Sequence, residues 1–259
     1  MPKKHPAPAN KRIFRFLLIV VLLALAVYVL LIRTNLISLL QPGPSPSDDL
    51  VPPTVLNAIS LPTPIKTSKI SLEQTLDKRR DRRDYEDKSI DLKILSQLLW
   101  SAQGVNTDWG DRTVFSYKSA HPLAVFVIAR QINGLDPGVY QYLPGDLRPT
   151  HQLLPLTHTI NQSDLDTALT LQPVRTAPLL LIIAGSSSRL AGAMPAESIS
   201  SYLYLEAGQV TQNVSLQIES LSLGTTPVFS FNTPLLSKLA NIPAGFTPLV
   251  VMPVGFPKP

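Results

Sequence analysis

The chain contains no cysteine in its 259 residues. This absence excludes disulfides, thiolate nucleophiles, iron–sulfur clusters and cysteine-based zinc sites, and it leaves the redox compartment open. The histidines show no spacing typical of metal ligands, so we expect no metal site; they are His5, His121, His151 and His158.

Several catalytic and nucleotide-binding motifs are also missing. The absence of GxGxxG and GxxxxGK[ST] argues against a Rossmann or P-loop nucleotide site. The serines of "AGSSSRLAG" form no GxSxG elbow, and no histidine is placed to serve as their base, which disfavours hydrolase chemistry. The net charge of +5 is concentrated near the N-terminus and in one short stretch, so we expect no nucleic-acid partner.

An unbroken apolar run, "FLLIVVLLALAVYVLLI", occupies residues 16–32. As a helix it nearly crosses the hydrocarbon core of a bilayer. Only Arg33 follows it closely, whereas several cations precede it: Lys3, Lys4, Lys11, Arg12 and Arg15. By the positive-inside rule we predict a basic cytoplasmic N-terminus over residues 1–15 and a retained transmembrane anchor helix over 16–40, with the rest of the chain extracytoplasmic. A cleaved signal peptide is the alternative.

The remainder reads as a linker and a folded domain. Residues 41–67 are rich in proline and predict an extended spacer, so the domain is expected over 68–259. Ser71 and Gln74 fit a capping box, and helical patterns cover 91–104 and 195–223. Short apolar runs predict strands at 122–130, 138–145, 177–185, 226–231 and 247–256. Helices and strands mix without strict βαβ alternation, which favours the α+β class.

The stretch "KRRDRRDYEDKSI", residues 78–90, places four arginines and a lysine within six residues. Acidic residues are interleaved, so its net charge is small. A polybasic membrane or nucleic-acid patch is normally purer, whereas guanidinium groups with local acidic partners suit one bound phosphate. The alternative is a solvated loop with surface ion pairs.

Polar residues also interrupt the apolar pattern of the second helical segment. Glu206 lies within "YLYLEAGQV", and Gln209, Gln212 and Asn213 follow within two helical turns. Buried polar groups need partners. These residues therefore belong either to a site or to backbone contacts where helices meet.

Taken in order, these segments resemble the nitroreductase superfamily, most closely its SagB-type dehydrogenase branch, over residues 70–257. The carrying motifs are "RRDRRDY", "LKILSQLLWSAQG", "RTVFSYKSAHPLAVFVIA", "GLDPGVYQYLPG", "YLEAGQVTQNVSLQIESLSLGTTPV" and "PLVVMPVGFP". The resemblance implies an α+β fold that binds FMN, usually as a homodimer with the flavin near the subunit interface. It also implies that the RRSxR motif, which contacts the FMN phosphate and ribityl chain, matches Arg79, Arg80, Asp81 and Arg83. The residues matched beside the isoalloxazine ring are Gly224, Thr225, Pro227 and Val228.

The chain departs from the family pattern at three places. Asp81 replaces the motif serine and should weaken phosphate binding unless it turns toward Arg82 or Arg83. Residues 115–122 read "FSYKSAHP" where the family has P-S-A-G-A-x-Y-P, and Gln209 replaces a histidine that is common in the branch. By resemblance Ser116 and Ser119 are cofactor-binding candidates. Lys118 is a catalytic candidate near flavin N1 and O2.

Three functions are consistent with these features. The first is a membrane-anchored FMN oxidoreductase that transfers hydride through flavin N5 to or from a small-molecule or peptide substrate. The second is a flavin-free relative that serves as a binding or assembly module. The third is a cytoplasmic-facing azoline dehydrogenase. If the domain is exported, NAD(P)H is not available, so electrons come from a quinone, a membrane partner or the substrate.

Overall fold

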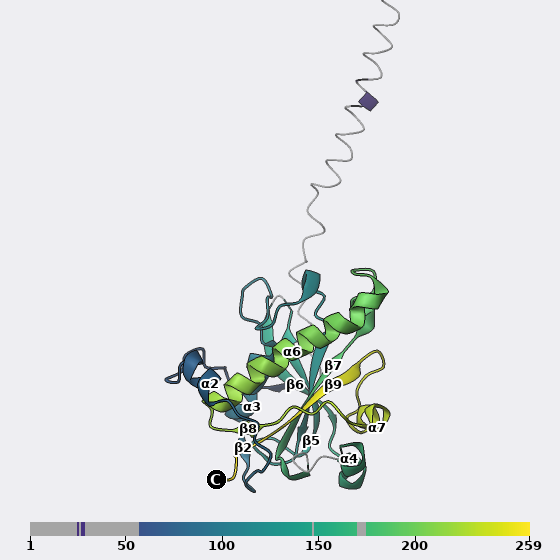
Figure 1. Ribbon diagram of the computed structural model, residues 1–259. Helices are drawn as coiled ribbons and strands as arrows, with labels where there is room; N and C mark the ends of the chain where they lie inside the picture. Colours follow the sequence, from purple (N-terminus) through teal and green to yellow (C-terminus); the bar gives the residue numbers. More distant parts are fainter. Residues whose placement is uncertain (1–24, 26, 29–56, 147, 170–174) are drawn as a thin grey trace, which may run out of the picture. The chain divides into compact units, whose positions relative to one another are not determined.

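A computed structural model describes residues 25, 27, 28, 57–146, 148–169 and 175–259 (Figure 1). The chain divides into two compact units, residues 1–54 and 55–259. The expected basic N-terminus lies outside the described residues, as do nearly all of the expected anchor helix and the first part of the linker. In the described ranges, no helix has the length and apolar character needed to cross a membrane.

A seven-stranded antiparallel sheet forms the centre of the second unit, in the order β1-β6-β5-β3-β7-β9-β8. The strands are β1 (Ile59–Ser60), β3 (Leu123–Ala129), β5 (Gly138–Gly145), β6 (Pro149–Thr157), β7 (Leu179–Gly185), β8 (Gly224–Thr225) and β9 (Thr247–Gly255). A separate parallel pair joins β2 (Ile90–Asp91) to β4 (Ile132–Asn133).

Helices cover both faces of this sheet (Figure 1). One face packs on α3 (Leu92–Gln103) and α6 (Ala196–Ser220), and the other on α4 (Gln162–Ala168) and α7 (Thr233–Leu239). Successive residues of β3 show the division, because Val125 and Val127 belong to the first core and Phe126 to the second. Burial on both faces explains why β3 and β7 are continuous apolar runs without polar alternation.

The expected helices are confirmed. The pattern over 91–104 forms α3, which ends at Gly104, and the pattern over 195–223 forms α6. Ser71 and Gln74 make the expected capping box at the start of α2 (Leu72–Lys78). In this box the Ser71 side chain accepts a hydrogen bond from the Gln74 N–H, and the Gln74 side chain accepts one from the Ser71 N–H.

Two expectations need correction. Residues 226–231 are not a strand, because only Val228 pairs there, in an isolated bridge to Val251, and Pro227 has no N–H to donate. The folded unit also begins before Ser68. In β1, Ile59 pairs with Leu153 of β6, and the backbone of Ile65 exchanges two hydrogen bonds with the Gln97 amide.

Candidate functional site

The arginine-rich segment follows α2 and lies against β8, the edge strand of the sheet. Its backbone is fixed there, because the Arg82 N–H donates to the Thr225 carbonyl of β8 at 3.0 Å. The buried Tyr85 anchors the next turn, with its hydroxyl 2.9 Å from the Arg82 carbonyl and 3.2 Å from the Pro253 carbonyl. The structure therefore brings together two segments that the resemblance assigns to one ligand: the RRDRR segment, residues 79–83, and the GTTPV segment, residues 224–228.

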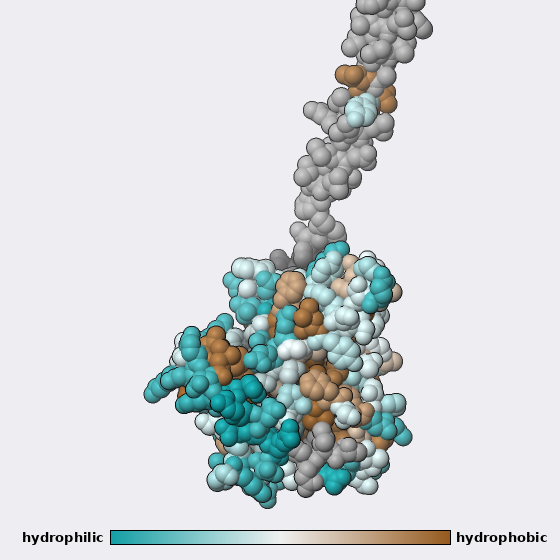
Figure 2. All heavy atoms as spheres, in the orientation of Figure 1, coloured by the Kyte–Doolittle hydropathy of each residue, from teal (hydrophilic) through white to brown (hydrophobic). Residues whose placement is uncertain are grey.

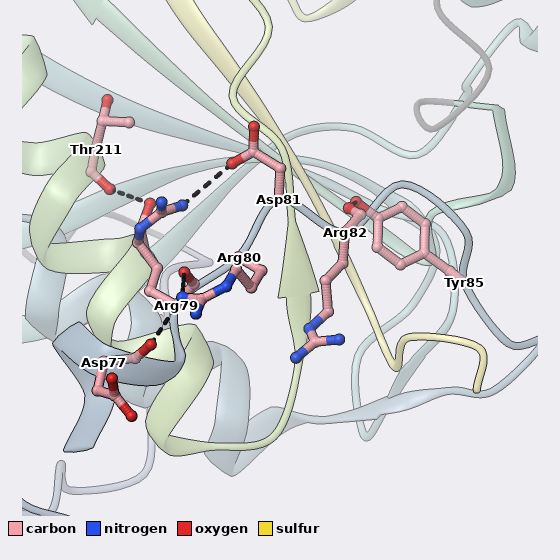
Figure 3. Close-up of polar contacts among 8 residues, drawn as sticks. Asp77, Arg79, Arg80, Asp81, Arg82, Tyr85 and Thr211 are labelled. Atoms are coloured by element: carbon pink, nitrogen blue, oxygen red, sulfur yellow. Dashed lines mark hydrogen bonds and ion pairs between the residues drawn. The ribbon is translucent and has the colours of Figure 1, made fainter.

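The arginine side chains of this segment take different directions (Figure 3). Arg79 forms an ion pair with Asp81, with Nη1 and Oδ1 3.2 Å apart. Arg80 turns back to the end of α2 and donates to the carbonyls of Asp77 and Arg79, at 2.7 and 2.8 Å. Arg82 points away from the Arg79–Asp81 pair (Figure 3). Asp81 is thus paired with Arg79, and it does not take the turn toward Arg82 or Arg83 that would have relieved its effect on phosphate binding.

Arg82 lines a pocket of about 380 Å³ that contains more cationic than anionic side chains. The other charged side chains on its wall are those of Lys78 on α2, Glu219 on α6 and Lys258 near the C-terminus. None of the three cations makes an ion pair within the described part of the chain. This pocket was not expected from the sequence, because Arg82 occupies the variable position of the RRSxR motif.

The GTTPV segment leaves few groups available for a ligand. Gly224 lies against Arg82, and an added Cβ would approach the arginine Cβ to 2.8 Å, so glycine is required there. Val228 is in the core, and its N–H and carbonyl both pair with Val251. The Thr225 Oγ1, by contrast, is buried without a hydrogen-bond partner among the described residues. The Thr225 hydroxyl and the partly exposed Pro227 are therefore the groups of this segment that remain available to a ligand.

The FSYK loop, residues 115–121, has an unusual backbone. Lys118, Ser119 and His121 all adopt positive φ, at 49°, 53° and 44°. Non-glycine residues rarely take this left-handed conformation, and runs of them occur where the surroundings hold the chain. Among the described residues, no hydrogen bond or ion pair joins this loop to the RRDRR segment.

Glu206 on α6 connects the long helix to the FSYK loop. Its side chain is 1% exposed, and Oε1 accepts the Tyr117 N–H at 3.1 Å. Burial raises the pKa of Glu206, while hydrogen bonds from Tyr117 and Ser116 and the charge of Arg112 act in the opposite direction. Of the other polar residues on this helix, Asn213 donates to the Thr113 carbonyl at 3.0 Å, whereas Gln212 is exposed.

Sequence reasoning missed Arg112, which is almost fully buried near this loop. Its side chain is 7% exposed, donates to Gln103 Oε1 at 2.9 Å and lies 3.5 Å from Asp146. The Nε atom has no hydrogen-bond partner in the described ranges. Burial lowers the pKa of Arg112, although a guanidinium stays charged. No local pattern marks this arginine, because its partners come from α3 and from the end of β5.

Comparison with known proteins gives consistent findings. The nitroreductase family model matches residues 76–256. A protein of Methanocaldococcus jannaschii that is named as a nitroreductase is 34% identical over 188 residues, which cover 72% of this chain and 91% of that protein.

Solved structures agree in fold. A crystal structure from Ralstonia eutropha, also named as a nitroreductase, has a TM-score of 0.65 at 25% identity and covers 80% of this chain and 92% of that one. A chain of the Escherichia coli microcin synthetase McbBCD complex has a TM-score of 0.59 at 20% identity, over 79% of this chain and 80% of that one.

Proposed function

The chain belongs to the nitroreductase family, and from that premise we propose that it is a membrane-anchored, FMN-dependent oxidoreductase of the SagB-type dehydrogenase branch. The observation that carries the proposal is the hydrogen bond from the Arg82 N–H to the Thr225 carbonyl, which joins the RRDRR segment to the strand that carries the buried, unpaired hydroxyl of Thr225. A buried polar atom without a partner marks a place where a ligand group completes the hydrogen bonding.

The residues present fit a phosphorylated flavin. Arg79 and Arg83 are accessible and offer planar, permanently charged donors, which suit a phosphate dianion. Asp81 already holds Arg79, so a phosphate has to compete with that carboxylate for the guanidinium. We therefore expect weaker retention than serine in place of Asp81 would allow. Arg80 contributes less, because its guanidinium is bound to the end of α2.

A bound flavin would supply the two-electron chemistry, with hydride exchanged at its N5, and the protein would bind, orient and shield it. Lys118 is our candidate for the cation near N1 and O2. We propose a homodimer from the family resemblance, with the flavin near the subunit interface.

Exposed apolar side chains are consistent with such a dimer. Figure 2 shows them gathered over α2 and along α6. Leu72 and Leu76 on α2 are 59% and 52% exposed, and Leu205 on α6 is 57% exposed. Contiguous exposed apolar patches, rather than single side chains, mark interaction surfaces. The apolar run over residues 16–32 is our basis for the anchor, and an exported domain would draw electrons from a quinone, a membrane partner or the substrate.

One observation favours the second candidate, a flavin-free binding or assembly module. The Arg79–Asp81 ion pair gives one of the arginines that would hold the phosphate a carboxylate partner from the chain itself. Binding of FMN to the purified full-length chain distinguishes the two functions, because the module does not require it.

The test compares FMN affinity in three forms of the full-length chain, by quenching of flavin fluorescence. The double variant Arg79→Ala, Arg83→Ala should bind at least tenfold more weakly than the natural chain, since each charge-assisted contact contributes about 1.5–3 kcal/mol. Arg148→Ala, which removes another exposed arginine outside the segment, is the control and should bind normally. Equal affinity in all three forms would overturn the assignment of the phosphate site.

A further inference from the structure

A buried carboxyl group faces the most unusual backbone of the domain. Glu206 is 1% exposed and makes no ion pair with any residue that the structure describes. A carboxyl group in such a place needs hydrogen-bond donors. Its donors come from the FSYK loop, with the Tyr117 N–H 3.1 Å from Oε1 and the Ser116 hydroxyl also bonded to it.

The FSYK loop does not hold its conformation by sequence preference. Lys118, Ser119 and His121 all have positive φ and none is glycine. Within the loop, Ser116 Oγ accepts the His121 N–H at 2.9 Å, and this bond closes the turn. An internal bond of this kind shapes the loop but does not fix it to the domain. Contacts from outside must do that.

Two outside elements make those contacts. Arg189 donates to the His121 carbonyl at 2.7 Å, on one side of the loop. On the other side α6 presents Tyr202 and Glu206, one helical turn apart and therefore on the same face. The Tyr202 ring meets the Tyr117 ring edge to face at 5.5 Å, and Glu206 binds the Tyr117 N–H. Both α6 residues reach the loop backbone, because Glu206 accepts the Tyr117 N–H and the Tyr202 hydroxyl is also hydrogen-bonded to the Tyr117 backbone.

We infer that Glu206 is a positioning residue that fixes the left-handed conformation of the FSYK loop and thereby sets where Lys118 points. Lys118 is exposed at the tip of the loop, with Nζ 5.4 Å from the Tyr117 ring centroid. The function of Lys118 toward a flavin rests on the proposed function, whereas the control of the loop by Glu206 does not.

The charge state of Glu206 should matter, because an ionised carboxylate is a stronger acceptor than the protonated acid. Several other charged or titratable groups surround this site. Arg112 acts on Glu206 directly, and Tyr202 and Tyr117 flank it. His121 and Arg189 lie on the far side of the loop. Asp146 acts on both His121 and Arg112, and Asp111 acts on His121. His121 also titrates, so its contribution has to be removed experimentally.

The first test follows the Tyr117 amide of the full-length chain by NMR as pH is varied. We expect its proton shift to titrate with a midpoint above that of an ordinary glutamate, and the step to vanish in Glu206→Gln. The step should persist in His121→Asn, since asparagine tolerates positive φ and does not titrate. Glu197→Gln, at the exposed start of α6, is the matched control and should leave the step unchanged. A Tyr117 shift that does not titrate, or that still titrates in Glu206→Gln, would overturn the inference.

The second test measures amide hydrogen exchange in Glu206→Ala and Glu206→Gln. The Tyr117 and His121 amides should exchange about 10 to 100 times faster in the alanine variant, as expected for loss of a bond to a charged acceptor. Glutamine keeps a carbonyl acceptor and should restore most of the protection. Amides of β3 should not change in either variant. Uniform acceleration across the domain, or an unprotected loop in the natural chain, would contradict the role proposed for Glu206.

A third experiment measures FMN affinity and is independent of the two amide measurements. If FMN binds, Glu206→Ala and Lys118→Ala should weaken it by similar factors, and the double variant should be little worse than either single change, because both act through one loop. Additive losses would show that Glu206 does not act through Lys118. If FMN does not bind at all, the proposed function fails while the amide measurements still decide the role of Glu206.

Discussion

Replacing Tyr142 with phenylalanine tests a buried chain of hydrogen bonds that ties the entry of the domain to its sheet. The Tyr142 hydroxyl lies 2.8 Å from His151 Nδ1, and His151 Nε2 lies 2.7 Å from Ser96 Oγ. Ser96 gives its single proton to the Pro62 carbonyl, at 2.5 Å. His151 must therefore donate from Nε2 to Ser96 and accept at Nδ1, and Tyr142 must be the donor.

The magnitude of the effect follows from this assignment. Tyr142→Phe keeps the ring in its packed position but leaves Nδ1 of His151 without a donor, which should lower the free energy of unfolding by about 1–3 kcal/mol at pH 7.5. The tyrosine side chain is only 2% exposed, so water does not replace the lost hydroxyl easily.

The effect should shrink in acid. Burial lowers the pKa of His151, so below the ordinary histidine value of about 6.5 the unfolded chain binds a proton that the folded chain does not. Stability from this histidine is complete above that pH and falls as pH decreases, by up to about 1.4 kcal/mol per pH unit. Without the Tyr142 donor, Nδ1 accepts a proton more readily. The variant should therefore lose less of its stability between pH 7.5 and 5.5 than the natural chain.

Urea unfolding at pH 7.5 and 5.5 measures both effects. Tyr204→Phe is the matched control, since Tyr204 is 55% exposed and its hydroxyl has no partner in the described residues. If Tyr142→Phe and Tyr204→Phe unfold alike at pH 7.5, or if the deficit of Tyr142→Phe grows in acid, the assigned proton arrangement is wrong.

Three further substitutions can be checked by thermal or urea unfolding. Gly104→Ala should destabilise by about 1–3 kcal/mol, because its Cβ would lie 2.2 Å from Trp100 Cδ1; no change would refute the packing. Gly208→Ala is the opposite case, with nothing within 4 Å in the middle of α6, and should stabilise the monomer by about 0.5–1 kcal/mol; a loss instead would place a second copy against this face. Ser71→Ala removes the capping box and should cost about 1 kcal/mol, seen also as faster amide exchange in α2, and unchanged exchange there would contradict it.

Short sequence patterns predicted the helices and strands whose own residues carry a signature of their structure. The capping box of α2, the apolar face of α3 and the doubly buried strands β3 and β7 all follow from short patterns. The β6 strand was missed, because its apolar residues do not alternate and it is defined by pairing with β5 and β1. β1 was read as linker for the same reason, since backbone pairing leaves no compositional mark.

The site was predictable in part. The sequence showed that Glu206 needed a partner, but not that the partner is the Tyr117 backbone, which folding brings to α6 from far along the chain. It also showed a cluster of arginines, but not that an extended chain sends Arg79 and Arg82 in different directions (Figure 3). The backbone conformation of Lys118 and Ser119 could not be foreseen, because neither residue favours positive φ.

The most direct test of the central claim is the visible absorption spectrum of the purified full-length chain, recorded as isolated and again after addition of FMN and removal of the excess. We predict the spectrum of a protein-bound flavin in at least the second sample, with less of it in the Arg79→Ala, Arg83→Ala variant. A folded protein that stays colourless after exposure to FMN would contradict the claim that this nitroreductase-family chain is a flavin enzyme.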